Sequence, residues 1–375
     1  MLQSWFEKKI NERKENLLLR KLTVSEGLID FTSNDYLGLA RSEELSRQIV
    51  LRMRDLGVHS NGATGSRLLS GNDAYTQTVE RKLARIFKAE AALIFNSGYA
   101  ANLAVLSSLP QRGDTILYDE LSHACIKDGA RLSLASRFSF RHNDLDDLEQ
   151  KIRRAKGRVF VVVESIYSMD GDECPLIQLT TLANGYGASL IIDEAHSTGI
   201  VGESGNGLSV SIGVHEQFAA RVYTFGKAMG IHGAVVVGSQ LLIDYLINFS
   251  RPFIYTTALP PHSVVAIECA FDFLSKNIAL QDALRNKINL FCEQVASVDN
   301  RTDSKSPIQT ALYPGNENVK RAAQKVQAQN FDVRPILSPT VPVNAERLRI
   351  CLHTFNTDDD IVALASLLKS MNGLV

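Results

Sequence analysis

The middle of the chain, from about residue 90 to residue 240, alternates short apolar segments with longer amphipathic ones. The apolar segments, rich in β-branched residues, are typical of buried strands and lie at residues 91–95, 115–118, 158–164, 189–193, 221–224 and 234–237. Segments with helical spacing lie between several of them, at residues 99–109, 124–134 and 176–184. Since helical connections of this length join parallel strands, the pattern predicts a mainly parallel sheet covered by helices on both faces.

The rest of the chain predicts further parts. At roughly 150 residues per domain, the length predicts two domains. Residues 2–19 have apolar side chains near helical spacing, which predicts an amphipathic helix packed on the body of the protein or on a partner subunit. After residue 250 a helical stretch from about 262 to 298 precedes mixed short elements. We therefore expect an N-terminal helix and arm (1–40), a large α/β domain (41–250) and a small α+β domain (251–375).

Charge and cysteine content exclude several classes of protein. The chain has 40 Lys and Arg against 41 Asp and Glu, and this near-neutral balance disfavours binding to nucleic acids or anionic membranes. Its five cysteines form no CxxC pair, which argues against a zinc ribbon or a disulfide framework. No apolar run reaches the roughly 18 residues of a membrane span. We expect a cytoplasmic protein without a metal site.

Titratable side chains follow the predicted strands, at the edge where ligands bind in parallel sheets. His123 follows the strand at 115–118, Asp193 ends the strand at 189–193, and Lys227 follows the strand at 221–224. Acids, histidines and a lysine gathered at one sheet edge are typical of an active site. The sequence therefore predicts an enzyme.

Residues 193–196 spell DEAH after an apolar strand, as in ATPases that bind Mg²⁺ through an acid. Such enzymes require the phosphate loop G-x-x-x-x-G-K-[ST]. The one Gly-Lys pair, Gly226-Lys227, is followed by Ala228 and lies downstream of the acid, and Arg221 occupies the place of the first glycine. These departures strongly disfavour an ATPase, an alternative that nucleotide binding would reveal. The motifs of hydrolases, zinc proteases and dinucleotide-binding enzymes are absent, which weakens those interpretations too.

An Asp, a His and a Lys at successive strand ends fit the chemistry of pyridoxal 5′-phosphate. This cofactor needs a lysine for a Schiff base, an acid at its pyridine nitrogen and a cradle for its phosphate. Lys227 lies in a glycine-flanked turn and Asp193 ends a strand. Gly98 and Tyr99 begin a predicted helix, whose backbone N–H groups are suited to an anion.

Nine sequence blocks in order, over nearly the whole chain, resemble those of a known family. They are FTSNDYLGLA (31–40), GATGSRLLSG (62–71), FNSGYAAN (95–102), DELSHACI (119–126), ESIYSMDGD (164–172), IIDEAHSTGIVGESGNG (191–207), YTFGKAMGIHGA (223–234), IYTTALPP (254–261) and SPTVPVNAERLRI (338–350). On these blocks the chain resembles the α-oxoamine synthases among the fold-type I pyridoxal-phosphate enzymes. The resemblance implies a large domain with a mainly parallel seven-stranded sheet, a smaller C-terminal α+β domain, and a homodimer with its active site at the subunit interface.

The same resemblance assigns cofactor contacts. It implies that Lys227 bonds to the cofactor and later acts as the base at the substrate Cα, that Asp193 pairs with the pyridine nitrogen, and that His123 stacks on the ring. The other implied contacts are Ser168 and His196 at the 3′-oxygen, Gly98, Tyr99 and Thr224 at the phosphate, and Thr256 and Thr257 at a phosphate across the dimer interface. Simpler structural roles stay open for His123 at a helix start and for Ser168 in a turn.

The resemblance also implies substrate contacts. Arg349 matches the clamp for the amino acid carboxylate, a role that suits a bidentate guanidinium, and Asn34 is a second contact. Arg20 matches an arginine near the far carboxylate of the acyl substrate, and Thr340 is a further candidate contact. Structural alternatives are an Asx turn for Asn34, and a solvated surface position for Arg20 and for Arg349.

The implied reaction is a decarboxylative condensation of an amino acid with an acyl thioester. The blocks are most similar to those of the family member that joins L-alanine to a pimeloyl thioester in biotin biosynthesis, with coenzyme A or an acyl carrier protein as the carrier. One alternative is a sister synthase of the glycine C-acetyltransferase or serine palmitoyltransferase type, which takes glycine or serine. Another is a cofactor-binding module without catalysis.

Overall fold

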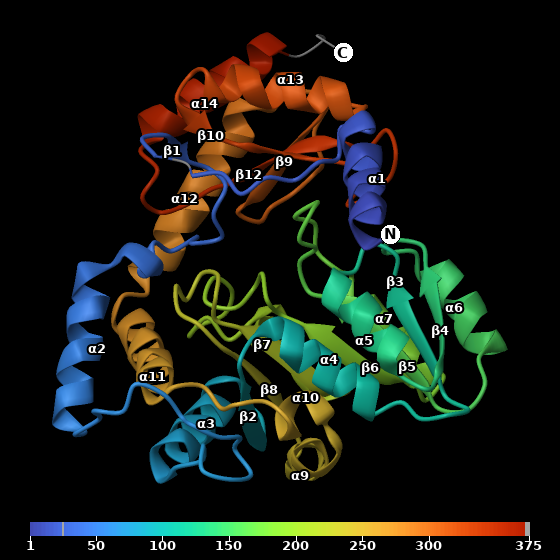
Figure 1. Ribbon diagram of the computed structural model, residues 1–375, viewed down its shortest axis with the longest axis vertical. Helices are drawn as coiled ribbons and strands as arrows, with labels where there is room; N and C mark the ends of the chain where they lie inside the picture. Colours follow the sequence, from blue (N-terminus) through green and yellow to red (C-terminus); the bar gives the residue numbers. More distant parts are fainter. Residues whose placement is uncertain (25, 372–375) are drawn as a thin grey trace. The chain divides into compact units, whose positions relative to one another are not determined.

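The computed structural model describes residues 1–24 and 26–371, which divide into two compact units (Figure 1). Unit 1 contains Met1–Ser33, Met169–Gly171 and the chain from Arg285 onward, and unit 2 contains Asn34–Ser168 and Asp172–Leu284. The divisions differ from the expected ones at residues 40 and 250. The segment after residue 250 stays with unit 2 because helix α11 (Pro261–Lys276) packs on helix α2 (Glu43–Asp55).

Unit 2 is built on a seven-stranded sheet, as predicted. The strands are β2 (Ala91–Phe95), β3 (Thr115–Asp119), β4 (Ser136–Phe140), β5 (Val159–Glu164), β6 (Ser189–Asp193), β7 (Phe218–Thr224) and β8 (Ala234–Gly238). Their order across the sheet is β2-β8-β7-β6-β5-β3-β4. β8 runs antiparallel to both of its neighbours and the other pairs are parallel, which confirms the mainly parallel sheet.

The edge strand β4 is the one strand of this sheet that the sequence pattern does not predict. Its residues, SRFSF, pair in parallel with β3, yet the first four are exposed and only Phe140 is buried. An edge strand with so little buried surface has no apolar run to reveal it.

Helices cover both faces of the sheet, as predicted. Besides α2 and α11, they are α3 (Ala74–Ile86), α4 (Gly98–Ser108), α5 (Ala124–Leu132), α6 (Leu145–Arg154), α7 (Leu176–Gly185), α8 (Leu208–Ser211), α9 (Gln240–Phe249) and α10 (Arg251–Ile254), with short 3₁₀ turns at Leu39–Arg41 and His215–Gln217. On one face Val105 of α4 and Leu246 of α9 share an apolar cluster with the sheet. On the other, Leu148 of α6 and Leu179 of α7 belong to a second cluster.

Unit 1 is a small α+β structure. It contains α1 (Leu2–Glu15), β1 (Ile29–Asp30), β9 (Ile308–Leu312), α13 (Asn316–Gln327), β10 (Phe331–Asp332), β11 (Arg334–Ile336), β12 (Arg347–Cys351) and α14 (Asp358–Met371). β12 lies between β11 and β9 in an antiparallel sheet, and β1 pairs in parallel with β10. The predicted helical stretch over 262–298 contains two helices, α11 and α12 (Ala279–Gln294), and Asn277 is the C-cap of the first.

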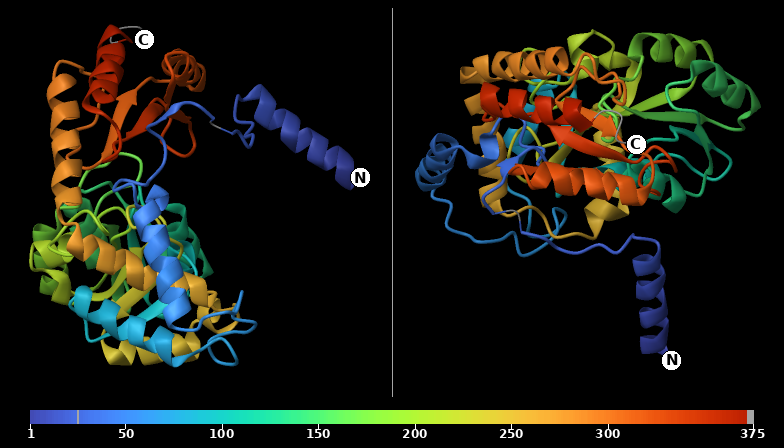
Figure 2. Two further views of the ribbon diagram at one scale, coloured as in Figure 1. Left: turned by 90° about the vertical axis from the view of Figure 1, so that its left-hand side faces the viewer. Right: turned by 90° about the horizontal axis from the view of Figure 1, so that it is seen from above.

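Helix α1 projects from the rest of unit 1 (Figure 2). It ends at Glu15, short of the predicted residue 19, and Leu17 beyond it has a positive φ of 57°. None of its residues is buried, and Trp5 and Phe6 are about half exposed. The expected packing on the body of the protein is therefore not observed, while packing on a partner subunit stays a prediction.

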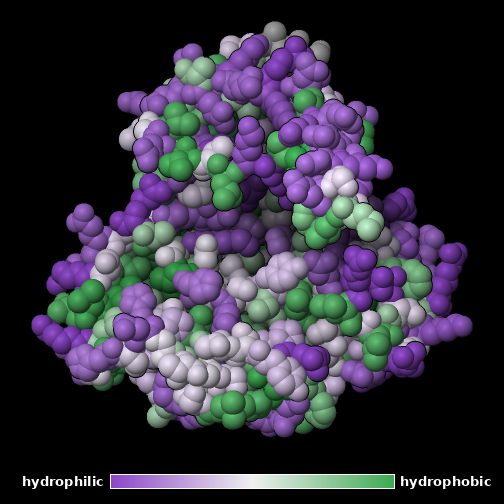
Figure 3. All heavy atoms as spheres, in the orientation of Figure 1, coloured by the Kyte–Doolittle hydropathy of each residue, from purple (hydrophilic) through white to green (hydrophobic). Residues whose placement is uncertain are grey.

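The surface of the molecule mixes polar and apolar side chains, and hydrophobic residues interrupt the hydrophilic face in Figure 3. Among the described helices, none has the length and hydropathy needed to cross a membrane.

Candidate active site

Asp193, at the carboxyl end of β6, is held by donors on both carboxylate oxygens. The backbone N–H of Ala195 donates to Oδ1 at 2.9 Å, and Nδ2 of Asn102 donates to Oδ2 at 2.7 Å. Asp193 is only 6% exposed. These neutral donors fix the orientation of a buried carboxylate, as its predicted role at a pyridine nitrogen requires.

Lys227 lies in the turn that joins β7 to β8. Paired residues of the two strands bound this turn, since Thr224 lies opposite Ala234 and the N–H of Phe225 donates to the carbonyl of Gly233 at 2.9 Å. Inside the turn, Gly230 has a φ of 65°, and a Cβ there would lie 2.2 Å from the backbone N of Ala40. Only glycine fits this approach, so the backbone that carries Lys227 is fixed on both sides.

His123 is the N-cap of α5, and its ring is part of the cap. Nδ1 accepts from the backbone N–H of Cys125 at 3.2 Å and lies 2.9 Å from Cys125 Sγ. The backbone N–H of His123 donates to Oε1 of Glu164 at 2.5 Å. Because Nδ1 is an acceptor, the neutral ring carries its proton on Nε2. The predicted helix-start role and the predicted ring-stacking role are thus compatible.

The charges of the predicted site act on His123. Partial desolvation lowers the pKa of His123, Asp193 opposes this shift, and Lys227 adds to it, so the imidazole is neutral at pH 7. Glu164, opposite Asp193 in the register of β5 and β6, is fully enclosed, and burial next to Asp193 raises its carboxyl pKa. The structure therefore brings the acid, the histidine and the lysine within electrostatic range of one another.

His196 and Asn34 are linked through Tyr36. The buried hydroxyl of Tyr36 donates to Oδ1 of Asn34 at 3.1 Å and lies 2.9 Å from Nδ1 of His196. A residue predicted to contact the cofactor and one predicted to contact the substrate thus share one hydrogen-bond chain. Ser168 is 5% exposed and lies in the loop after β5. An antiparallel bridge between Ile166 and Glu173 joins the two sides of this loop.

The start of α4 has the form of an anion site. Ser97 caps the helix by accepting from Ala100 N–H at 3.2 Å, which leaves the N–H groups of Gly98 and Tyr99 at the helix N-terminus. A Cβ on Gly98 would lie 2.1 Å from Oγ1 of Thr224. The absence of a side chain at Gly98 therefore allows the Thr224 hydroxyl to reach the helix N-terminus, which brings together the three residues predicted to bind phosphate.

Thr256 and Thr257 lie beside the same helix start. Nδ2 of Asn96 donates to Thr256 Oγ1 at 3.3 Å and to the carbonyl of Thr257 at 2.9 Å. Asn96 immediately precedes the cap residue Ser97, so both threonines lie near the start of α4 in their own chain. Their role across a dimer interface stays a prediction.

Three of the four predicted substrate contacts belong to unit 1. Arg20 and Thr340 line one cavity of about 240 Å³, together with Arg13 and apolar residues of the segments 18–19 and 335–339. Arg349 lies on β12, the central strand of the small sheet, where its Nη1 is 3.0 Å from Cys351 Sγ. The fourth residue, Asn34, belongs to unit 2.

Residues that position the site were not identified from the sequence. Asn102 lies four residues after Gly98 on α4 and thus on the same helix face, a spacing that could have marked it. Glu164 and Asp193 end neighbouring strands, but their adjacency depends on strand order, which no local pattern gives. Tyr36 lies in the FTSNDYLGLA block without a recognised role.

Comparisons with known proteins show the family of the chain. The family model for aminotransferase class I and II matches residues 26–365. The 8-amino-7-oxononanoate synthase of Emericella nidulans is 37% identical over 382 residues, covering 95% of this chain and 92% of the relative. The structure of 8-amino-7-oxononanoate synthase from Francisella tularensis covers 92% of this chain and 98% of its own, with a TM-score of 0.79 and 31% identity.

A second solved structure has higher structural but lower sequence similarity. It is a serine palmitoyltransferase from S. paucimobilis with a bound PLP–myriocin aldimine, which covers 100% of both chains with a TM-score of 0.90 and 25% identity. The fold predicted from the sequence, that of the fold-type I transferases, is confirmed. The chain belongs to the aminotransferase class I and II family.

Proposed function

We propose that the protein is a pyridoxal-phosphate-dependent acyltransferase that joins L-alanine to a pimeloyl thioester with loss of CO₂. This is the reaction of an 8-amino-7-oxononanoate synthase, the name borne by the relatives from E. nidulans and F. tularensis. The observation that carries the proposal is the arrangement of Asp193, His123 and Lys227 beside the N-terminus of α4.

The residues fit the cofactor by their geometry. The cradle between Gly98 and Thr224 would be filled by a single Cβ, and it opens at a helix N-terminus, which suits a phosphate. Oδ1 of Asn102, next to Asp193, is buried without a hydrogen-bond partner in the described chain. Bound here, pyridoxal phosphate supplies an electron sink for the electrons left at the substrate Cα when a bond to that carbon breaks.

The chain's own groups hold and move the protons. Asp193, fixed by Asn102 and Ala195, accepts the hydrogen bond of a protonated ring nitrogen. Nζ of Lys227 takes the proton from the substrate Cα. His123, neutral and oriented by its helix cap, offers a flat uncharged surface to a ring. The Arg349 guanidinium holds the amino acid carboxylate in a bidentate pair.

We extend the proposal to assembly and location. The protein acts in the cytoplasm as a homodimer, with Thr256 and Thr257 serving the partner's phosphate site. The large apolar side chains Trp5, Phe6, Leu69 and Tyr255 are exposed on the single chain, which supports a protein interface. Arg20 would face the far carboxylate of the acyl group, delivered on coenzyme A or on an acyl carrier protein.

The test begins with the absorbance spectrum of the protein reconstituted with pyridoxal phosphate. A band of lysine-bound cofactor that shifts more with L-alanine than with glycine or L-serine supports the proposal, provided that product forms from a pimeloyl thioester. A shift and product with glycine or serine alone would assign a sister synthase instead. Lys227→Ala should lose both the band and turnover, whereas Lys151→Ala, at a partly exposed position of α6 where the lysine pairs with Asp147, should keep both.

The dimer is tested by mixing two inactive variants. Lys227→Ala and Thr257→Ala supply complementary intact residues to one site if Thr257 serves the partner subunit. Activity regained after mixing supports the shared site. Two inactive proteins that stay inactive in a mixed dimer contradict it.

A further inference from the structure

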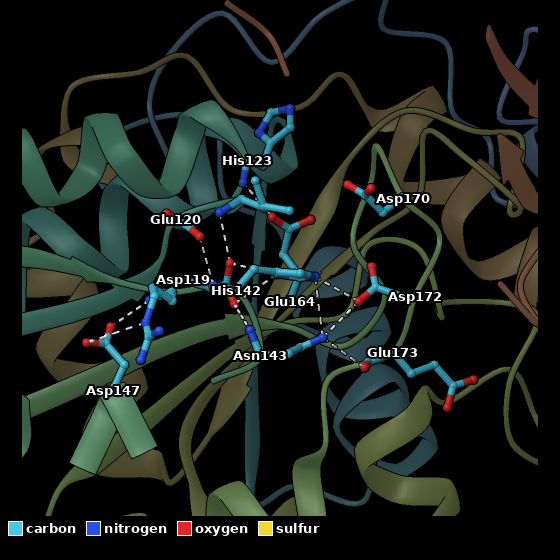
Figure 4. Close-up of polar contacts among 12 residues, drawn as sticks. Asp119, Glu120, His123, His142, Asn143, Asp147, Glu164, Asp170, Asp172 and Glu173 are labelled. Carbon is cyan, nitrogen blue, oxygen red and sulfur yellow. Dashed lines mark hydrogen bonds and ion pairs between the residues drawn. The ribbon is translucent and has the colours of Figure 1, made fainter. Parts of the chain in front are cut away.

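An ion cluster outside the proposed proton-transfer groups lies between two loops of unit 2 (Figure 4). At its centre is His142, with Nδ1 2.9 Å from Oδ1 of Asp119 and Nε2 2.8 Å from Oδ2 of Asp172. Asp119 is fully buried, and the side chain of His142 is 22% exposed. Each ring nitrogen of His142 thus faces a different carboxylate.

This arrangement requires a charged imidazole. A neutral ring has one N–H, and its second nitrogen would point a lone pair at a carboxylate, whereas the imidazolium donates to both. Burial opposes the charge, but the hydrogen bonds to Asp119 and Asp172 raise the pKa of His142 to about 10. Two further neighbours of His142 are uncharged or acidic: Oε1 of Glu120 accepts from the backbone N–H of His142, and the ring of Tyr167 meets the imidazole edge-on with the ring centroids 4.5 Å apart.

The two carboxylates shape different loops. Asp119 ends β3 and accepts the N–H of Leu121 at 2.8 Å, which sets the start of the loop that carries His123. The carbonyl of Asp172 accepts the N–H of Tyr167 at 3.0 Å, which closes the loop that carries Ser168. The His142 ring connects these loops through charge-assisted hydrogen bonds, the stronger kind in proteins.

Asn143 repeats the connection beside His142. Its backbone N–H donates to Oδ2 of Asp119 at 2.9 Å and its Nδ2 donates to Oδ2 of Asp172 at 2.8 Å. Asn143 has a φ of 51°, in the left-handed region that asparagine tolerates better than most residues. Two consecutive residues therefore bind the same two carboxylates from a segment that contacts neither His123 nor Ser168 in the described hydrogen bonds.

We propose that His142 is a positioning residue for the cofactor site, where its imidazolium holds the His123 loop and the Ser168 loop in register with each other. The inference rests on the proposed function for the identity of the ligand that the two loops meet. It goes beyond that function because His142 touches none of the groups assigned to proton transfer. Loss of its charge would leave Asp119 buried without its cationic partner, and Asn143 alone would then connect the two loops.

The test compares His142→Phe with wild type and with His215→Phe, a matched change at a histidine in the 3₁₀ turn before β7. Pyridoxal phosphate is titrated into each apoprotein, and the dissociation constant and the circular dichroism of the bound cofactor are recorded. We expect His142→Phe to bind at least tenfold more weakly and with a reduced cofactor signal per bound molecule. Wild type and His215→Phe should agree within twofold.

Further measurements separate positioning from a general loss of stability. If His142→Phe does not fold, His142→Asn and His142→Gln, which each introduce an uncharged NH₂ group able to donate, are titrated in its place. Hydrogen exchange should rise at residues 121–123 and 165–168 in the variant. A variant that melts at a lower temperature but keeps cofactor affinity and signal would overturn the inference. If wild type itself binds no pyridoxal phosphate, the proposed function fails and this inference fails with it.

Discussion

Asn102 joins the two ends of the proposed cofactor site. Its Nδ2 donates to Oδ2 of Asp193 at 2.7 Å and to the carbonyl of Gly98 at 3.1 Å. The helix whose N-terminus is the proposed phosphate site therefore also holds Asp193, the acid proposed to meet a ring nitrogen. Gly98 and Asn102 are four residues apart, so one turn of α4 separates the helix N-terminus from the amide that binds Asp193.

Replacing Asn102 by alanine should weaken catalysis through Asp193. A hydrogen bond to a charged group contributes about 1.5–3 kcal/mol, so kcat/KM for L-alanine should fall roughly tenfold to hundredfold. Steady-state kinetics check this, with Asn184→Ala as the control because Asn184 bonds to Gln217 on an exposed surface. Equal losses in the two variants would argue against the role of Asn102.

Gly98→Ala should abolish tight cofactor binding. The added Cβ would lie 2.1 Å from Oγ1 of Thr224, so either the hydroxyl or the helix N-terminus must move. Cofactor titration should show a dissociation constant at least tenfold larger than that of wild type. Gly185→Ala, where nothing lies within 4 Å of the added Cβ, should bind as wild type does. Unchanged binding by Gly98→Ala would place the phosphate elsewhere.

The contribution of His142 to stability should disappear at high pH. Its pKa is about 10 in the folded protein against an ordinary value of 6.5, so the folded state holds the proton more tightly. The stabilisation is fully present below pH 6.5 and is lost as the pH rises through 10. We expect the free energy of unfolding of wild type relative to His142→Phe to fall by up to about 5 kcal/mol between those limits, at roughly 1.4 kcal/mol per pKa unit. Urea titrations at several pH values measure this difference, and a constant difference would contradict the assignment.

Glu268 should be a main stabilising carboxylate of the outer helices in unit 2. It is 7% exposed and accepts from Arg52 at 2.9 Å, Tyr75 at 2.5 Å and Lys82 at 3.4 Å. Glu268→Gln should lower the free energy of unfolding by about 1–3 kcal/mol. Asp272→Asn removes the other partner of Lys82 from a half-exposed position and should cost less than about 0.5 kcal/mol. Urea unfolding that shows equal losses would mean that burial does not distinguish the two acids.

The strands were predictable, and the residues proposed to react could be named, because the signals in the sequence are local. Apolar β-branched runs mark β5 and β6, Asp193 ends β6, and Lys227 lies shortly after the end of β7. The strand β4 was not predicted because only its last residue is buried. The unit boundary at Leu284 was not predicted because it depends on how α11 packs against α2.

The positioning residues of the site depend on distant parts of the chain. Glu164 reaches the backbone of His123 only because β5 lies next to β3, and Tyr36 reaches His196 across 160 positions of sequence. The spacing of apolar residues along the sequence gives no information about such long-range pairs. Their residue types are ordinary ones that occur throughout the chain, so neither composition nor spacing sets them apart.

The antiparallel course of β8 has a consequence for how this protein can vary. Because the chain returns at once along the neighbouring strand, the stretch between Thr224 and Ala234 is a closed span, pinned where it leaves the sheet and where it re-enters. Gly230 fixes it a third time, against Ala40. Many substitutions within the span would leave its backbone path unchanged. One inserted or deleted residue could not be accommodated between the fixed ends and would displace Lys227 relative to β7 and β8. We therefore expect the number of residues in this span to be more strictly constrained than the identity of most of them.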